Sequence, residues 1–270
     1  MANRLDWQSI AGAVRGQRIG RRIVYLETTG STNDDARRLA VAGEAEGTVV
    51  LADEQTAGRG RSGKSRWLTP AGTSVALSVF LRPPLPPDRL PLLSMLAGVA
   101  VVQAVHASTG VRCRLKWPND VMVGDLKLGG ILVETALAGA VVAYAIAGVG
   151  LNGNVGAASL GPFPDTALRP TSLQDQAGSP VSREAVVTAL LQSLDPLYED
   201  LLGGRHAIIR ERYVASLDTL GRRVVVLDLS GGRAEGIAED IAESGALIVR
   251  LPDATRREFA HGEVTVRPAS

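Results

Sequence analysis

The apolar periodicity of this chain switches repeatedly between the spacing of strands and the spacing of helices, and this feature limits the possible folds most. The runs Ile23–Glu27 and Val49–Asp53 have the character of strands, whereas Asn33–Gly43 between them has helical spacing and stops at a glycine. Because strands and helices follow one another along one chain, we predict an α+β domain in which helices pack on a mixed β-sheet.

The same pattern continues to about residue 217. Further strands are predicted at Ser74–Leu81, Arg112–Lys116, Asp120–Val123, Gly130–Thr135 and Ala140–Val149, and further helices at Leu92–Ser108 and from Arg183 to about Leu217 with a break at Gly203-Gly204. The uncharged stretch from Thr135 to Pro164 is interrupted by Gly and Asn, so we predict buried strand in its front half and no membrane span.

After Gly221 the composition becomes rich in short β-type runs. They lie at Arg222–Asp228, Ala234–Ile241, Ala246–Leu251, Arg256–Ala260 and Glu263–Val266, with hairpin signals at Gly231-Gly232 and Ser244-Gly245. Five short strands in about 50 residues predict a small appended β-barrel. We therefore expect two domains, at residues 1–219 and 220–270.

Charge and cysteine content exclude several functional classes. The 29 basic and 28 acidic residues leave a net charge of +1, which argues against a general binder of nucleic acid or membrane surfaces, so any cationic site must be local. Cys113 is the single cysteine, which excludes a disulfide framework and a thiolate metal cluster. Charged residues at the N-terminus occupy the place of a signal peptide's apolar run, and we expect a reducing cytoplasm.

A glycine-rich basic segment between Asp53 and Trp67 carries the strongest chemical signal. Its cations are Arg59, Arg61, Lys64 and Arg66, and its glycines are Gly58, Gly60 and Gly63. Glycines allow the backbone to approach a ligand closely, and cations neutralise phosphate, so the segment predicts an anion-binding loop.

Residues Gly58 to Ser65 also spell the P-loop pattern G-x-x-x-x-G-K-[ST], and Val224–Asp228 has the form of a Walker-B strand. A P-loop requires a helix that opens at its Lys-Ser pair. Pro70 and Gly72 would break such a helix within two turns, so we do not favour a P-loop NTPase or kinase.

Five motifs together resemble the biotin–protein ligases over most of the chain. They are the loop Glu54–Arg61, the Lys-Trp-Pro-Asn-Asp segment Lys116–Asp120, the segment Lys127–Glu134, the Gly-Ser-Thr-Asn segment Gly30–Asn33, and the Gly-x-Gly-x-Asn segment Gly148–Asn152. The resemblance implies a class II synthetase-like catalytic domain of the biotin/lipoate ligase type, followed by an SH3-like β-barrel. Ser31-Thr32-Asn33 also has the composition of a helix N-cap.

The resemblance implies an activity and its participants. Such an enzyme forms biotinyl-5'-AMP from biotin and ATP, with Mg²⁺ carried mainly by the phosphates and no dedicated metal site. It then transfers biotin to a lysine of a biotin carboxyl carrier protein, an acetyl-CoA carboxylase subunit, or of another biotin-dependent carboxylase. A homodimer is compatible with the resemblance. The chain ahead of Ile23 is too short for the helix-turn-helix domain of bifunctional members, so we expect no nucleic-acid partner and no repressor role.

The resemblance also implies roles for individual residues. Catalysis is expected from Lys127, Arg61 and Asp120. The biotin-binding residues are expected to be Ser31, Thr32, Asn33, Gln55, Arg59, Gly60, Arg61, Lys127 and Gly130. The ATP-binding residues are expected to be Arg59, Lys64, Trp67, Lys116, Asn119 and Asn152, with Trp67 stacking on the adenine. The spacing from the loop to Trp67 is one residue longer than in the family, which leaves open whether Lys64 or Arg66 faces phosphate.

Two other functions remain as alternatives. A lipoate–protein ligase would share the fold and the adenylate chemistry, but its Arg-Arg-x-Ser-Gly-Gly-Gly loop is absent from the sequence. A non-enzymatic binding module would use the β-rich tail to recruit partners.

Overall fold

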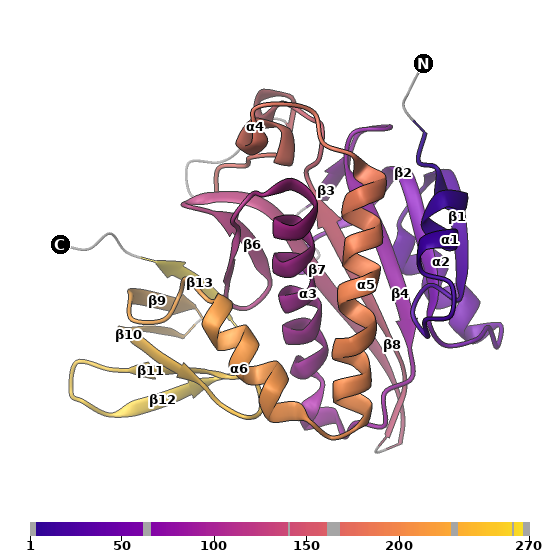
Figure 1. Ribbon diagram of the computed structural model, residues 1–270. Coiled ribbons are helices and arrows are strands. Elements are labelled where there is room, and N and C mark those ends of the chain that lie inside the picture. The colour runs from indigo at the N-terminus through magenta and orange to yellow at the C-terminus, as the bar shows by residue number, and fades with distance from the viewer. Residues whose placement is uncertain are drawn as a thin grey trace.

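A larger α+β body and a small five-stranded antiparallel sheet make up the molecule (Figure 1). This computed structural model describes residues 4–61, 66–139, 141–160, 168–227, 232–260 and 262–266. In the larger body the sheet has the strand order β1-β2-β4-β8-β7-β6-β5, with β3 paired to β2. The β1–β2 pair is parallel and the other pairs of this sheet are antiparallel. The mixed sheet predicted from the sequence is confirmed.

The helices and strands have the following bounds. The large sheet consists of β1 (Arg22–Thr29), β2 (Thr48–Arg59), β3 (Arg66–Thr69), β4 (Val75–Leu81), β5 (Arg114–Lys116), β6 (Asp120–Val123), β7 (Leu126–Ala138) and β8 (Val141–Leu151). The helices are α1 (Trp7–Ala13), α2 (Thr32–Val41), α3 (Pro91–Thr109), α4 (Leu173–Ala177), α5 (Arg183–Leu202) and α6 (His206–Ser216), with 3-10 turns at Pro87–Arg89 and Ala157–Leu160. The small sheet consists of β9 (Arg223–Leu227), β10 (Arg233–Ile241), β11 (Leu247–Arg250), β12 (Arg256–Phe259) and β13 (Glu263–Val266).

Helices cover both faces of the large sheet. Successive side chains of a strand point to opposite faces, so each strand contributes residues to both of the cores that these helices close. Val50, Phe80 and Ile146 pack with α2 on one face. Val49 and Val79 belong to the main core together with α3 and α5, which lie side by side in Figure 1. This arrangement explains why β2 and β4 are apolar at consecutive positions, as strands buried on both faces must be.

Helix α3 is the central core helix. Eleven of its residues are buried, and it packs on α5, α6 and the large sheet. Together with the preceding 3-10 turn, over Pro87–Thr109, it is among the described residues the one helical segment long and apolar enough to cross a membrane, and 61% of its apolar window is buried inside the protein.

Three elements were not predicted from the sequence: α1, β3 and α4. Helix α1 is short and is capped at its N-terminus by Asp6, whose carboxylate accepts a hydrogen bond from the Ser9 amide. Strand β3 decides against the P-loop, because residues 66–69 pair with β2 where a P-loop helix would open. Helix α4 has only five residues, too few for helical periodicity to show.

The small sheet has the strand order β12-β11-β10-β9-β13, its strand β10 packs on α6, and its turn between β10 and β11 contacts α3. Gly245, in the turn between β10 and β11, approaches α3 so closely that an added Cβ would lie 2.5 Å from Pro91 Cβ. Arg210 of α6 donates to the Ile241 carbonyl at 2.7 Å. The five predicted strands are thus present, while the domain boundary between residues 219 and 220 stays a prediction.

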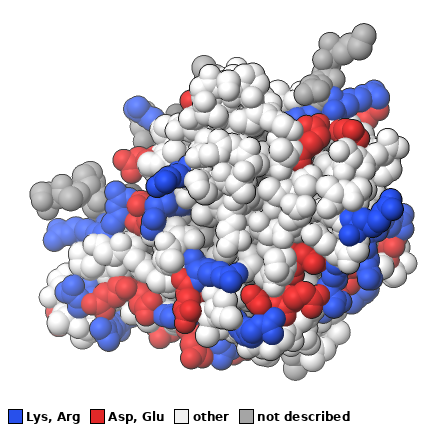
Figure 2. All heavy atoms as spheres, viewed as in Figure 1, with Lys and Arg blue, Asp and Glu red and all other residues white. Residues whose placement is uncertain are grey.

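Acidic and basic side chains are interspersed along the rim of the face shown in Figure 2, around a broad uncharged area. This distribution agrees with the near-zero net charge.

Candidate active site

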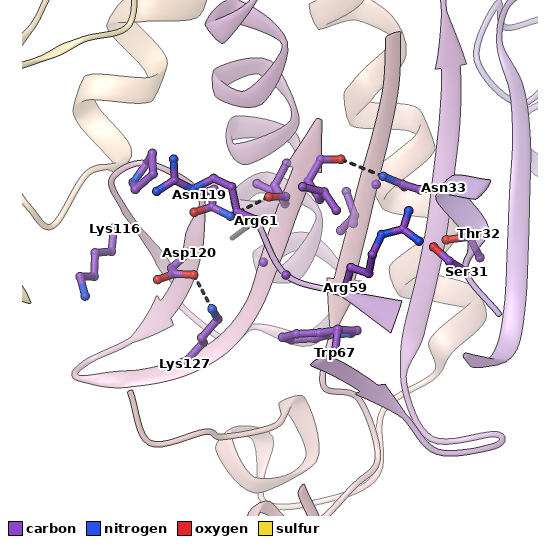
Figure 3. A pocket seen from close by; sticks show the side chains of 18 of the residues that line it. Ser31, Thr32, Asn33, Arg59, Arg61, Trp67, Lys116, Asn119, Asp120 and Lys127 are labelled. Carbon is purple, nitrogen blue, oxygen red and sulfur yellow. Dashed lines mark hydrogen bonds and ion pairs between the residues drawn. The ribbon is translucent and has the colours of Figure 1, made fainter. Parts of the chain in front are cut away.

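A cavity of about 320 Å³ lies where the N-terminus of α2, the end of β2 and strands β6 to β8 meet. Figure 3 shows its two ends: Ser31, Thr32, Asn33 and Arg59 on one side, and Lys116, Asn119, Asp120 and Lys127 on the other. One end therefore offers mainly hydroxyl and amide groups, and the other offers charged groups.

Thr32 and Gln55 form the polar end of the cavity. The Thr32 backbone N–H and its hydroxyl both donate to Gln55 Oε1, at 2.9 and 3.1 Å. Gln55 Nε2 donates to the Thr69 hydroxyl at 3.2 Å, which fixes the orientation of the amide. Ser31 is the N-cap residue of α2, but its side chain makes no capping hydrogen bond. The N-cap is thus confirmed by position alone, and the Ser31 hydroxyl lines the cavity.

Asn33 is fixed by hydrogen bonds on both sides of its amide. Its Oδ1 accepts from the buried Ser78 hydroxyl at 2.6 Å, and its Nδ2 donates to Glu134 Oε2 at 2.7 Å and to the Leu132 carbonyl at 3.3 Å. The Ser78 hydroxyl also lies 2.8 Å from Thr32 Oγ1. A buried amide with these partners presents one fixed polar surface to a ligand.

Ser78 and Glu134 belong to this network and were not predicted as site residues from the sequence. Ser78 had a signal, because it is the single polar residue of the otherwise apolar strand β4 and is fully buried there. A polar residue at such a position needs a hydrogen-bond partner. Glu134 was noted only as the last residue of a motif.

Two glycines of β8 form the floor of the cavity. A Cβ on Gly148 would lie 2.2 Å from Asn33 Oδ1, and a Cβ on Gly150 would lie 2.5 Å from Trp67 Nε1. The glycines therefore allow Asn33 and the Trp67 indole to lie directly against the strand. The Trp67 N–H is buried and has no hydrogen-bond partner among the described residues.

Lys127 and Asp120 form an ion pair at the charged end. Lys127 Nζ lies 2.5 Å from Asp120 Oδ1, and the lysine keeps 30% of its side chain exposed. Their strands are paired, since Asp120 at the start of β6 lies opposite Gly130 of β7. Asn119 Nδ2 donates to the Ile131 carbonyl at 2.8 Å, which fixes the turn that carries Asp120.

The small sheet also reaches this cavity. The Arg61 guanidinium donates to the Gly262 carbonyl, and Val264 of β13 lines the cavity. Trp117, also in the lining, donates its indole N–H to the Gly245 carbonyl at 3.1 Å. Two motifs of the larger body therefore each contact a backbone carbonyl in the C-terminal segment.

Thirteen of the predicted site residues line this one cavity. They are Ser31, Thr32, Asn33, Gln55, Arg59, Gly60, Arg61, Trp67, Lys116, Asn119, Asp120, Lys127 and Gly130. Asn152 does not line it: the residue is buried and its Nδ2 donates to the Thr171 carbonyl at 2.8 Å. Lys64 lies outside the described residues, as does the side chain of Arg66, and the choice between them stays open.

Comparison with known proteins identifies the class to which this fold and cavity belong. The sequence model of the Biotin/lipoate A/B protein ligase family matches residues 25–152, and that of the Biotin protein ligase C terminal domain matches residues 219–267. The first match contains both ends of the cavity, and the second contains the small sheet.

Individual relatives narrow the class further. The chain is 36% identical to a biotin–[acetyl-CoA-carboxylase] ligase of Paracoccus denitrificans, over 84% of this chain and 93% of the relative. It is 35% identical to the enzyme of the same name from Mycobacterium tuberculosis, over 90% and 89%. Its fold matches the biotin protein ligase of Aquifex aeolicus in complex with biotin and ATP, with a TM-score of 0.74, 26% identity, and coverage of 92% and 100%. The chain belongs to the biotin protein ligase family.

Proposed function

We propose that this chain is an ATP-dependent biotin–protein ligase that forms biotinyl-5'-AMP and then transfers biotin to a lysine of a carrier protein. The observation that carries the proposal is the two-ended cavity. Biotin is itself two-ended, with a neutral ureido head and an anionic carboxylate. The Ser31-Thr32-Asn33 segment and Gln55 suit the head, because hydroxyls and amides both donate and accept. Lys127 at the other end suits the carboxylate.

In the first half-reaction a biotin carboxylate oxygen attacks the α-phosphorus of ATP, and the bond to pyrophosphate breaks. Two anions must approach each other, so fixed cations supply most of the barrier reduction. We assign this role to Lys127 and Arg61. Trp67, Lys116 and Asn119 are assigned to ATP, on the resemblance and on their place in the lining. Asn152 could then act on adenine only through the backbone it fixes.

In the second half-reaction the carrier lysine amine attacks the acyl carbon of the adenylate, and AMP leaves. The attacking amine must lose a proton. Asp120 lies at the charged end beside Lys127 and is our choice to orient that amine. The carrier is a biotin carboxyl carrier protein or another biotin-dependent carboxylase.

Magnesium is expected to arrive with the triphosphate. The described residues include no group of three or more His, Cys, Asp or Glu side chains that could hold a metal ion. Asp120 is the one carboxylate among the described residues that line the cavity, and it could add one oxygen ligand to an ion held by the phosphates. We assign the reaction to the cytoplasm. We also assign the larger body to a domain at residues 1–219 and the small sheet to a domain at residues 220–270.

Pyrophosphate release tests this function. Purified protein is incubated with ATP, Mg²⁺ and either biotin, lipoate or no acid. Release that depends on biotin supports the proposal, and release that depends on lipoate would assign the chain to the other branch of the matched family. Nucleotide hydrolysis independent of both acids would refute it. Mass spectrometry of an added carrier domain, with a gain of one biotinyl group on lysine, tests the transfer step.

A further inference from the structure

Four charged side chains from three elements form a cluster beside the polar end of the cavity. Arg59 at the end of β2 makes a bidentate pair with Asp34 of α2, with Nη1 2.6 Å from Oδ2 and Nη2 2.7 Å from Oδ1. Arg59 Nη2 also lies 3.5 Å from Glu134 Oε1 of β7. Arg37 of α2 lies 3.0 Å from both carboxylates. We call these four residues the Arg59 cluster.

The charges of the Arg59 cluster balance, with two cations and two anions. The hydrogen bond from Arg59 is the largest cause that lowers the pKa of Asp34, and the same bond raises the pKa of Arg59. Both groups therefore stay charged at the pH at which the protein works. Because both terminal nitrogens of Arg59 are bound to carboxylates, this guanidinium has little unbalanced charge to offer a phosphate.

The Arg59 cluster is connected directly to the polar end of the cavity. Glu134 accepts the Asn33 amide at 2.7 Å through the same carboxylate that faces Arg59 and Arg37. Figure 3 shows the Arg59 side chain beside Ser31 and Thr32, across the cavity from Lys127. A substitution in the Arg59 cluster should therefore affect the groups at the polar end of the cavity more than those at the charged end.

We propose that Asp34 and Glu134 are positioning residues that hold the Arg59 guanidinium across the polar end, so that Arg59 retains biotin and does not neutralise phosphate. This inference rests on the proposed function. It separates Arg59 from two other cations of the lining: Arg59 contacts the head of biotin, whereas Arg61 and Lys127 neutralise its carboxylate and the phosphates.

The test compares Asp34→Asn with the wild type by calorimetry of biotin without nucleotide, and by the KM values for biotin and ATP in pyrophosphate release. Asn keeps the shape but loses the charge and one acceptor oxygen, so Arg59 loses the bidentate ion pair and keeps one neutral hydrogen bond and the longer contact to Glu134. We expect the biotin Kd and KM to rise about tenfold, equivalent to about 1.4 kcal/mol, with the ATP KM unchanged. Asp34→Glu retains the carboxylate and should recover most of the affinity.

Asp35→Asn is the matched control. It removes the same charge from the same turn of α2, but its carboxylate bonds Thr29 and Arg38, whereas that of Asp34 bonds Arg59. It should leave both KM values unchanged. Arg59→Gln should weaken biotin to the same degree as Asp34→Asn, and the double variant should be no weaker, because both changes remove one interaction.

Three results would overturn the inference. Asp34→Asn and Arg59→Gln could bind biotin like the wild type, Arg59→Gln could raise the ATP KM and not the biotin KM, or the two changes could add. If Asp34→Asn does not fold, the biotin Kd and KM of Asp34→Glu and Arg59→Gln test the inference by themselves. A wild-type protein that binds no biotin would instead refute the proposed function, so the two failures are distinguishable.

Discussion

Lys127 is the residue on which the proposed chemistry depends most directly. Its ammonium lies 2.5 Å from Asp120 and remains partly exposed to the cavity, so it can contact a second anion. The sequence predicted its role from the motif, and the structure adds the partner that fixes its position. The pairing could not be inferred from spacing alone, because the two residues are brought together by the register of β6 and β7.

We expect Lys127→Ala to slow adenylate formation about 100-fold, because removal of one fixed electrostatic donor typically costs about 3 kcal/mol in the barrier. Biotin-dependent pyrophosphate release, measured under single-turnover conditions, checks this. Arg112→Ala, which changes an exposed cation outside the cavity, serves as the control and should react at the wild-type rate. An unchanged rate for Lys127→Ala would remove this residue from the mechanism.

Cys113 gives a residue-scale prediction for pH. Burial raises the pKa of its thiol to about 12, because the thiolate is poorly solvated inside the core. An unfolded thiol ionises at about pH 8.5, so unfolding releases a proton above that pH and stability falls as pH rises toward 12. Mass-spectrometric alkylation at pH 8 should therefore modify Cys113 only in denaturant. Stoichiometric labelling of the folded protein would contradict this.

At the scale of elements, β8 shows why the Gly-x-Gly-x-Asn motif stands where it does. Residues 148 and 150 face Asn33 and Trp67, so any side chain there would occupy the space that these groups need. The motif thus encodes a flat strand surface, and its asparagine fixes the following segment through Thr171.

We expect Gly148→Ala and Gly150→Ala to weaken biotin binding at least tenfold, since the added Cβ would displace Asn33 or the Trp67 indole from the cavity wall. Calorimetric titration with biotin measures the loss. Gly156→Ala is the control, because a Cβ added there would have no atom within 4 Å and the φ of this glycine is not positive. Equal affinity in all three variants would show that the floor has no role in binding.

Most elements could be predicted from periodicity, and the exceptions have a common cause. Long amphipathic or apolar segments such as α3 and α5 have enough turns for their period to show. β3 has four residues and exists because it pairs with β2, which no local pattern reveals. β2 itself extends to Arg59, six residues beyond the predicted end, since this pairing supports its polar half.

At the scale of the whole molecule, two residues of the sequence motifs connect the larger body to the C-terminal segment. Trp117 is 3% exposed, and its indole N–H reaches the Gly245 carbonyl 128 residues away. Arg61 reaches the Gly262 carbonyl across 201 residues. A shift of the small sheet would therefore change the position of both motifs.

Trp117→Phe keeps an aromatic ring at this position but removes the indole N–H. The Gly245 carbonyl then loses the hydrogen bond that it accepts from Trp117. We expect a loss of about 1–2 kcal/mol in the free energy of unfolding, together with a lower kcat/KM for adenylate formation. Urea denaturation and pyrophosphate release measure the two effects. Arg89→Ala breaks the solvent-exposed pair with Glu243 at the same interface and should cost less than about 1 kcal/mol. An equal effect of both changes would argue against a specific role for Trp117.

The sequence by itself determined the order of the elements and the residue types that converge on the cavity, because periodicity and short motifs are local and survive without coordinates. Only the tertiary structure decided how those residues are paired: Arg59 with Asp34, Asn33 with Ser78 and Glu134, and Trp117 with Gly245. The physical reason is that these pairs depend on strand register and on the packing of distant elements, and neither leaves a periodic trace in the chain.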